Sequence, residues 1–108
     1  MKPFKEAEEY DKDLQAAYDY YKDYGIGTAL RFLDAYEKSV GIIQTSPYVS
    51  RARKHGWRQM VIHEYPNYSI FYRELDEVWL LGGVICTVQD PDSILVRLLI
   101  REATEEGG

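Results

Sequence analysis

Apolar residues recur at helical spacing in the first half of the chain. Between residues 10 and 24 they align on one face of an amphipathic helix, at Tyr10, Leu14, Ala17, Tyr21 and Tyr24. A face of this kind is expected to be buried. Gly25 is predicted to follow the helix in a left-handed conformation, and Thr28 to lie in the N-cap region of a second helix.

The second helical pattern occupies residues 29 to 43 and ends before Pro47. Its apolar positions are Ala29, Phe32, Leu33, Tyr36, Val40 and Ile43. Because only a few residues connect the two patterns, the helices should lie antiparallel as a hairpin. The 10 tyrosines of the chain could stack on nucleic-acid bases. Tyrosine rings at helical spacing more simply form a core whose hydroxyl groups reach its edge.

The stretch from Trp57 to Asp90 has the alternation of β-strands. Three runs, residues 56–65, 68–75 and 78–88, are separated by Pro66-Asn67 and Asp76-Glu77. Such short connections predict an antiparallel β-meander. Gly82 and Gly83 inside the third run indicate a β-bulge or a close approach of another group to the backbone, and we favour the bulge.

Neither face of the middle strand is purely polar. One face should carry Tyr68, Ile70 and Tyr72, and the other Ser69, Phe71 and Arg73. We therefore expect the hairpin to cover one face and the last segment to cover part of the other. That segment fits a helix capped by Asp92 or Ser93, which we favour, or a strand. The pattern predicts an α+β fold, with an N-terminal antiparallel helical hairpin on a small antiparallel sheet of about three strands and a short C-terminal helix.

Length and composition predict a single domain spanning residues 1–108. The single cysteine, Cys86, excludes an intramolecular disulfide and is expected to be a small buried apolar residue. No secretory signal is recognisable and no apolar run is long enough to span a membrane as a helix, so we expect a cytoplasmic protein. His55 and His63, with Glu64, make a poor metal site, and neither metal nor cofactor is expected.

The net charge of −5 argues against a general nucleic-acid binder. Between residues 47 and 75, however, bases outnumber acids, through Arg51, Arg53, Lys54, Arg58 and Arg73. Such a local patch can hold a phosphate or a carboxylate-rich partner. Arg58 and Arg73 could instead form ion pairs with Glu64, Glu74 or a helix carboxylate, and Arg58 could stack on Trp57.

Taken in order, these segments resemble the RelE/ParE superfamily of toxins from type II toxin-antitoxin systems, which includes plasmid stabilisation proteins. The resemblance runs from about Tyr10 to Asp92. Its most specific parts are the tyrosine pair Tyr20-Tyr21 before a glycine, the A-x-x-F-L-D-A-x-E pattern of residues 29–37, Gly56-x-Arg58, and the Y-x-I-F-Y-R strand of residues 68–73. The resemblance implies a small cytoplasmic bacterial toxin neutralised by a cognate antitoxin. Some members cleave messenger RNA on the ribosome, and others poison DNA gyrase.

The beginning of the chain departs from the family pattern. Family members usually open with a β-strand before the first helix, whereas residues 1–5 are few and interrupted by Pro3. A strand is therefore not predicted here, and its absence would leave one edge of the sheet uncovered.

The second departure concerns chemistry. In the ribonuclease members a basic cluster, a middle-strand arginine and a C-terminal tyrosine or histidine activate the ribose hydroxyl and stabilise the transition state. Arg51, Arg53 and Lys54 match the cluster in part, but Ser69 replaces the arginine and no tyrosine or histidine follows Tyr72. We therefore predict no catalytic residue.

The resemblance is closest to the ParE-like, non-ribonuclease branch, which acts by binding a target such as DNA gyrase. The alternatives are a ribosome-dependent messenger RNA endoribonuclease and a degenerate homologue that only binds an antitoxin or dimerises. The residues expected to contact the antitoxin or the target are Arg51, Arg53, Lys54, Arg58 and Arg73. Direct contact with nucleic acid is expected only through the basic loop.

Overall fold

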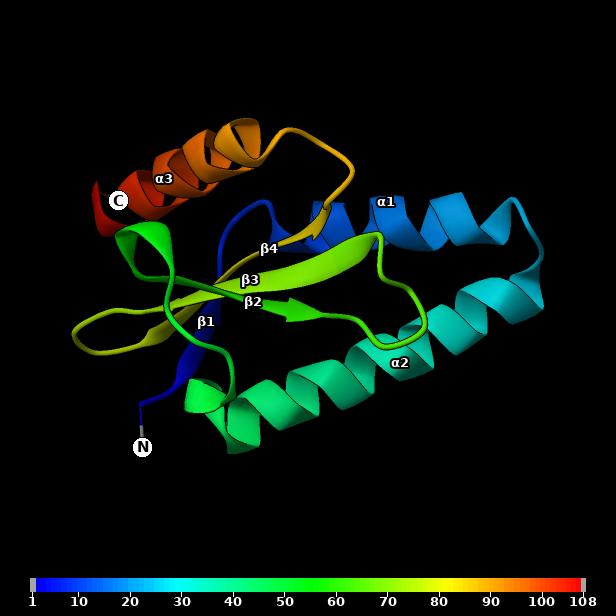
Figure 1. The fold of residues 1–108 in the computed structure, drawn as a ribbon, viewed down its shortest axis with the longest axis horizontal. Helices are drawn as coiled ribbons and strands as arrows, with labels where there is room; N and C mark the ends of the chain where they lie inside the picture. The colour runs from blue at the N-terminus through cyan, green and yellow to red at the C-terminus, as the bar shows by residue number, and fades with distance from the viewer. Residues whose placement is uncertain (1, 108) are drawn as a thin grey trace.

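The computed structural model describes residues 2–107 as an α+β fold in which one sheet lies between two helical layers (Figure 1). The strands are β1 (Phe4–Glu6), β2 (Trp57–Val61), β3 (Tyr68–Glu74) and β4 (Trp79–Cys86). The helices are α1 (Tyr10–Lys22), α2 (Ile26–Thr45) and α3 (Pro91–Gly107), and short turns η1 (Pro47–Val49) and η2 (Lys54–Gly56) precede β2. Within the described residues no helix is long and apolar enough to cross a bilayer.

The predicted helical hairpin is confirmed, but its connection differs from the prediction. Gly25 has φ +129° and ψ 148°, a positive-φ conformation that suits glycine but is not left-handed helical. Its N–H donates to the carbonyl of Lys22 at 2.9 Å, and α2 begins immediately afterwards at Ile26. Thr28 therefore lies inside the first turn of α2, and its assignment to the N-cap region was wrong.

The tyrosine-rich stripes form the core between the hairpin and the sheet, as predicted. Tyr10 and Tyr36 are buried, and their hydroxyl groups are 2.8 Å apart. Tyr72, fully buried in β3, donates its hydroxyl to the carbonyl of Pro47 at 2.7 Å. Tyr24 is the exception, because its side chain lies at the tip of the hairpin and is 69% exposed.

The sheet has the order β1-β4-β3-β2, and its last three strands form the predicted antiparallel meander. The N-terminal strand that the sequence did not predict is present. β1 pairs in parallel with β4, with Phe4 opposite Trp79. The N–H of Trp79 donates to the carbonyl of Pro3 and that of Ala7 to the carbonyl of Leu81, both at 2.9 Å. Pro3 thus directly precedes the strand and contributes its carbonyl to the pairing, rather than preventing it.

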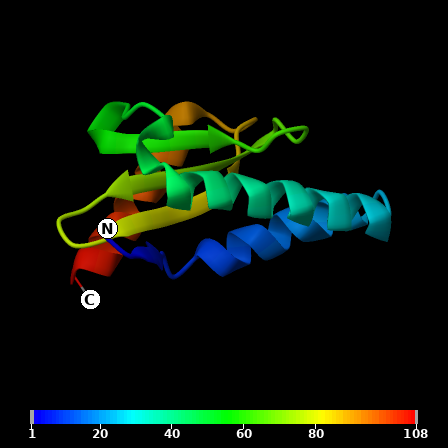
Figure 2. The same cartoon turned by 90° about the horizontal axis from the view of Figure 1, so that it is seen from below.

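The C-terminal segment is a helix that covers the face of the sheet opposite the hairpin (Figure 2). Asp90, not Asp92 or Ser93, caps it, because the Asp90 carboxylate accepts the N–H of Ser93 at 3.1 Å. Pro91 then occupies the first turn, where its missing N–H costs nothing. The buried residues of this second core are Ala7, Trp57, Phe71, Leu80, Ile85, Ile94 and Leu98.

Both interpretations of the glycine pair are confirmed. The register passes from Phe71 opposite Gly83 to Tyr72 opposite Leu81, so Gly82 is the extra residue of a bulge. A β-carbon at Gly82 would lie 2.5 Å from the Trp57 ring, and one at Gly83 would lie 2.5 Å from the Arg101 guanidinium. The two positions therefore also need glycine for close packing.

Candidate partner-binding site

The structure divides the five basic residues predicted to contact a partner into two groups. Arg51, Arg53 and Lys54 form an exposed group, called here the loop trio, between η1 and the start of β2. Among residues 2–107, no ion pair or side-chain hydrogen bond involves the trio. The loop closes through His55 (φ +58°) and Gly56 (φ +81°). All three cations are exposed to solvent.

Arg58 belongs to the second group, because it is turned into the protein. Its Nη1 donates to the carbonyl of Ser50 at 2.5 Å. Its guanidinium lies 5.0 Å from the Tyr48 ring centre and 5.8 Å from that of Trp79. Stacking on Trp57 does not occur, since neighbouring residues of a strand point to opposite faces of the sheet. Arg58 therefore holds the loop to the core.

Arg73 is also half-buried and internal. Its Nε lies 3.3 Å from Oε1 of Glu102 in α3, within ion-pair distance but without the geometry of a hydrogen bond. An ion pair between Arg73 and a helix carboxylate was one of the two roles predicted for this residue from the sequence. Its guanidinium also packs under Gly56, where an added β-carbon would lie 3.3 Å from Nη1.

A polar cluster closes the end of the sheet beside Arg58. Lys2 Nζ lies 2.7 Å from Oε2 of Glu74, and the Tyr48 hydroxyl donates to the same carboxylate at 2.9 Å and 3.0 Å. The hydrogen bonds from Lys2 and Tyr48 lower the pKa of Glu74. The bond to Glu74 raises the pKa of Tyr48. The pair therefore stays a charged acceptor and a neutral donor near neutral pH, which suits structural pairing better than proton transfer.

Ser69 is the residue that replaces the catalytic arginine of the ribonuclease members. It is fully buried in β3, and its hydroxyl accepts a hydrogen bond from Nε2 of Gln59 at 3.0 Å. The position faces α3 rather than solvent. The serine hydroxyl itself is therefore not exposed to a ligand on the protein surface.

An apolar hollow, the β2–α3 hollow, lies beside the loop trio, between β2 and the N-terminal half of α3. Its volume is about 410 Å³. Trp57, one of its lining residues, is only 4% exposed, and its indole N–H has no hydrogen-bond partner within residues 2–107. The other lining residues are Arg53, Lys54, Arg58, Gln59, Phe71, Pro91, Asp92, Ile94, Leu95 and Leu98. Sequence reasoning missed this site, because β2 and α3 meet only in the tertiary structure.

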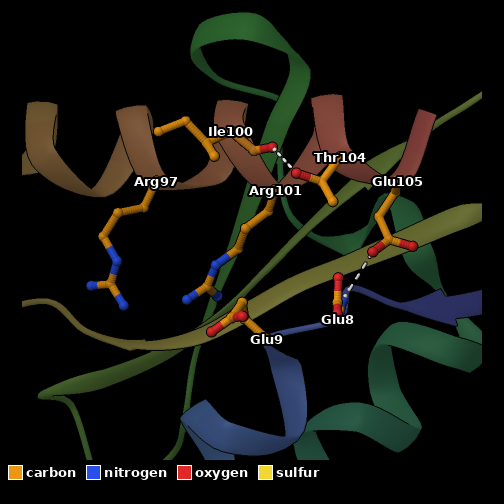
Figure 3. A pocket seen from close by; sticks show the side chains of 7 residues that line it. All are labelled: Glu8, Glu9, Arg97, Ile100, Arg101, Thr104 and Glu105. Carbon is orange, nitrogen blue, oxygen red and sulfur yellow. Dashed lines mark hydrogen bonds between the residues drawn. The ribbon is translucent and has the colours of Figure 1, made fainter. Parts of the chain in front are cut away.

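A second cavity, of about 340 Å³, lies between the start of α1 and the middle of α3 (Figure 3). Arg101 makes two hydrogen bonds to the Asp13 carboxylate, at 2.5 Å and 3.0 Å. Glu105 accepts the N–H of Glu8 at 3.0 Å (Figure 3). Its other carboxylate oxygen pairs with Lys5 at 3.1 Å. Because these charges are paired with one another, the cavity is a structural junction rather than a ligand site.

The residues considered for metal binding do not converge. No group of three or more histidine, cysteine or acidic side chains that could hold an ion occurs within the described part of the chain. His63 Nε2 lies 3.7 Å from Oε1 of Glu64, and both side chains are exposed. Cys86, expected to be buried, is partly exposed where β4 ends.

Comparisons with known proteins agree with this architecture. A solved chain from the "Chromosomal ParDE TA system from P. aeruginosa" superposes with a TM-score of 0.69, at 20% sequence identity, over 80% of this chain and 96% of that one. This likeness shows that the fold is that of a ParE-like toxin. No curated protein matches the sequence.

The family itself is shown by the sequence. Residues 7–104 match the family model described as the ParE toxin of the type II toxin-antitoxin system, parDE. The chain belongs to this family, and membership implies an antitoxin partner.

Proposed function

We propose that the protein is the toxin of a type II toxin-antitoxin module, is held inactive in the cytoplasm by a cognate antitoxin, and acts by binding a target such as DNA gyrase. The family match supports the role of toxin. The observation that favours binding over RNA cleavage is the buried Ser69, which is hydrogen-bonded to Gln59. At this position the ribonuclease members present a transition-state cation.

The surroundings of the loop trio support the same choice. Cleavage at a ribose 2′-hydroxyl needs a group that accepts its proton as well as positive charge for the phosphorane-like transition state. The trio supplies charge alone. Tyr48 and Glu74, the hydroxyl-carboxylate pair beside Arg58, are hydrogen-bonded to each other, and Glu74 also pairs with Lys2.

His55 supports a second candidate function. This exposed residue follows Lys54 directly, and an imidazole can transfer protons near neutral pH. Ribosome-dependent cleavage of messenger RNA through the loop is therefore the competing proposal.

Two assays on the purified protein decide between these functions. We expect inhibition of DNA supercoiling by gyrase and no codon-phased cuts in messenger RNA mapped by primer extension from a translating extract. Codon-phased cuts that disappear in the His55→Ala variant would establish the ribonuclease instead. Inactivity in both assays, with the product of a neighbouring reading frame still bound, would indicate a degenerate homologue that only binds an antitoxin.

A further inference from the structure

One edge of the sheet is open along β2. This strand stands at the end of the order β1-β4-β3-β2 and pairs only with β3. The N–H of Ile62 donates to the carbonyl of Tyr68 at 3.1 Å. This bond determines which residues of β2 point their backbone groups toward β3. In an antiparallel pair the backbone groups of alternate residues point toward and away from the neighbour. Met60 therefore points its N–H and C=O toward β3, and Gln59 and Val61 point theirs outward.

The outward groups of Gln59 and Val61 have no hydrogen-bond partner among residues 2–107, whereas the next outward carbonyl, that of Trp57, accepts the N–H of Arg53 at 2.8 Å. The open part of the edge is thus short. It begins where the loop trio ends. The side chain of Val61 is 49% exposed, so this position of the edge is open to solvent.

The β2–α3 hollow lies directly beside this edge. Trp57 and Gln59 share the α3 face of β2, and both line the hollow together with Leu95. In a strand added at the edge, every second side chain would point under α3 and into the hollow. An apolar side chain fits its walls, which include Trp57, Ile94, Leu95 and Leu98.

The positive charge beside the β2 edge indicates the charge of the partner. Arg53 and Lys54 line the hollow at the Trp57 end of the edge, and neither forms an ion pair within residues 2–107, although Asp92 of α3 lines the same hollow. A chain that pairs here would gain from carboxylates placed near these cations, mainly in its association rate and specificity.

We infer that an extended, acidic segment of the antitoxin adds to the sheet as a strand beside β2, places an apolar side chain in the β2–α3 hollow, and sets carboxylates against Arg53 and Lys54. Strand addition of this kind draws affinity from backbone hydrogen bonds and specificity from the pockets for alternate side chains. The inference rests on the proposed function, because the antitoxin supplies the segment.

Hydrogen exchange on the complex tests the pairing directly. The full-length product of the neighbouring reading frame serves as the partner. We expect the amides of Gln59 and Val61 to gain protection when it binds, whereas the amide of Met60, already bonded to β3, is protected in both states. Unchanged exchange at Gln59 and Val61 in a saturated complex would overturn the inference.

Two pairs of variants test the edge and the hollow separately. Val61→Pro removes an outward N–H without breaking the ladder to β3, and Val61→Thr is its control. Leu95→Glu puts a carboxylate in the hollow, and Val96→Glu puts the same charge on the exposed face of α3. We expect Val61→Pro and Leu95→Glu to weaken binding about tenfold or more, which is about 1.4 kcal/mol, and both controls to bind like wild type.

The outcomes separate this inference from the proposed function. If wild type binds the partner and the two test variants bind equally well, the strand-addition inference falls and the role of toxin stands. If wild type forms no complex, both fall. Protection of Gln59 and Val61 that rises with protein concentration in the absence of a partner would assign the edge to a second copy of this chain. Thermal melts of each variant identify any loss of folding, and the exchange experiment needs no variant.

Discussion

The side chain of Asp13 takes the place of a strand. β1 ends at Glu6, so on the β1 side β4 has no neighbouring strand beyond Leu81. There the Asp13 carboxylate accepts the N–H of Val84 at 3.1 Å, and Arg101 donates to the carbonyl of Gly82 at 2.9 Å. The side chains of Asp13 and Arg101 are only 9% and 10% exposed, and their mutual hydrogen bonds offset the cost of burying two charges.

The glycine beside this ion pair gives a prediction at the scale of one residue. Gly83→Ala should lower the free energy of unfolding by about 1–3 kcal/mol, because its β-carbon would press on Arg101 and Asp13. Gly41→Ala, in α2 with nothing within 4 Å of the added carbon, should raise it by about 0.5–1 kcal/mol. Urea unfolding of both variants measures the difference. Equal changes of the same sign in the two variants would mean that Arg101 and Asp13 move away from the added carbon at no cost in free energy.

At the scale of elements, the sequence predicted what local periodicity encodes. α1, α2 and the meander follow from helical and alternating patterns, and Gly82 and Gly83 marked the bulge. β1 was not predictable, because its three residues follow Pro3 and are stabilised by pairing with Leu80 and its neighbours, far away in the chain. For the same reason the sequence grouped Arg58 with the loop trio, although Ser50 and Tyr48 draw it inward.

The basic loop gives the prediction at this scale. Replacing Arg51, Arg53 and Lys54 together by alanine should leave the thermal midpoint nearly unchanged, since these side chains are exposed and unpaired within the described structure. Binding of the antitoxin should weaken and depend less steeply on salt. Arg58→Ala is the contrasting control and should lower the midpoint. Identical salt slopes for wild type and the triple variant would exclude the trio from the interface.

At the scale of the whole molecule, stability depends on keeping the buried phenols neutral. Burial raises the pKa of Tyr21 to about 12. Burial, followed by interaction with Tyr36, raises the pKa of Tyr10, and burial also raises that of Tyr68. In the unfolded chain tyrosines ionise near pH 10. Above that pH the unfolded state binds fewer protons than the folded state, so the free energy of unfolding falls as pH rises.

We therefore expect stability that is insensitive to tyrosine ionisation below about pH 10 and decreases from there toward about pH 12. Tyr10→Phe should make this alkaline decrease shallower, while costing about 1 kcal/mol at neutral pH through the lost hydrogen bond to Tyr36. Tyr24→Phe, at a ring that is 69% exposed, should leave stability at neutral pH unchanged, and its alkaline decrease should change only through Tyr20, whose pKa is raised mainly by the hydrogen bond to Tyr24. Chemical unfolding at a series of pH values measures the free energy of unfolding of all three proteins. An alkaline decrease in Tyr10→Phe as steep as in wild type would contradict the role given to the Tyr10 phenol.

The two edges of the sheet differ in how their backbone groups are satisfied. At the β1 end, three residues of strand are followed by the Asp13–Arg101 seal on β4, which occupies the backbone groups of Gly82 and Val84. At the β2 end the outward backbone groups of Gln59 and Val61 have no hydrogen-bond partner within residues 2–107, so two molecules could meet there as a symmetric pair. Such a pair would occupy the same backbone groups of β2 that the inferred strand of a partner would use, so self-association and partner binding at this edge would exclude each other.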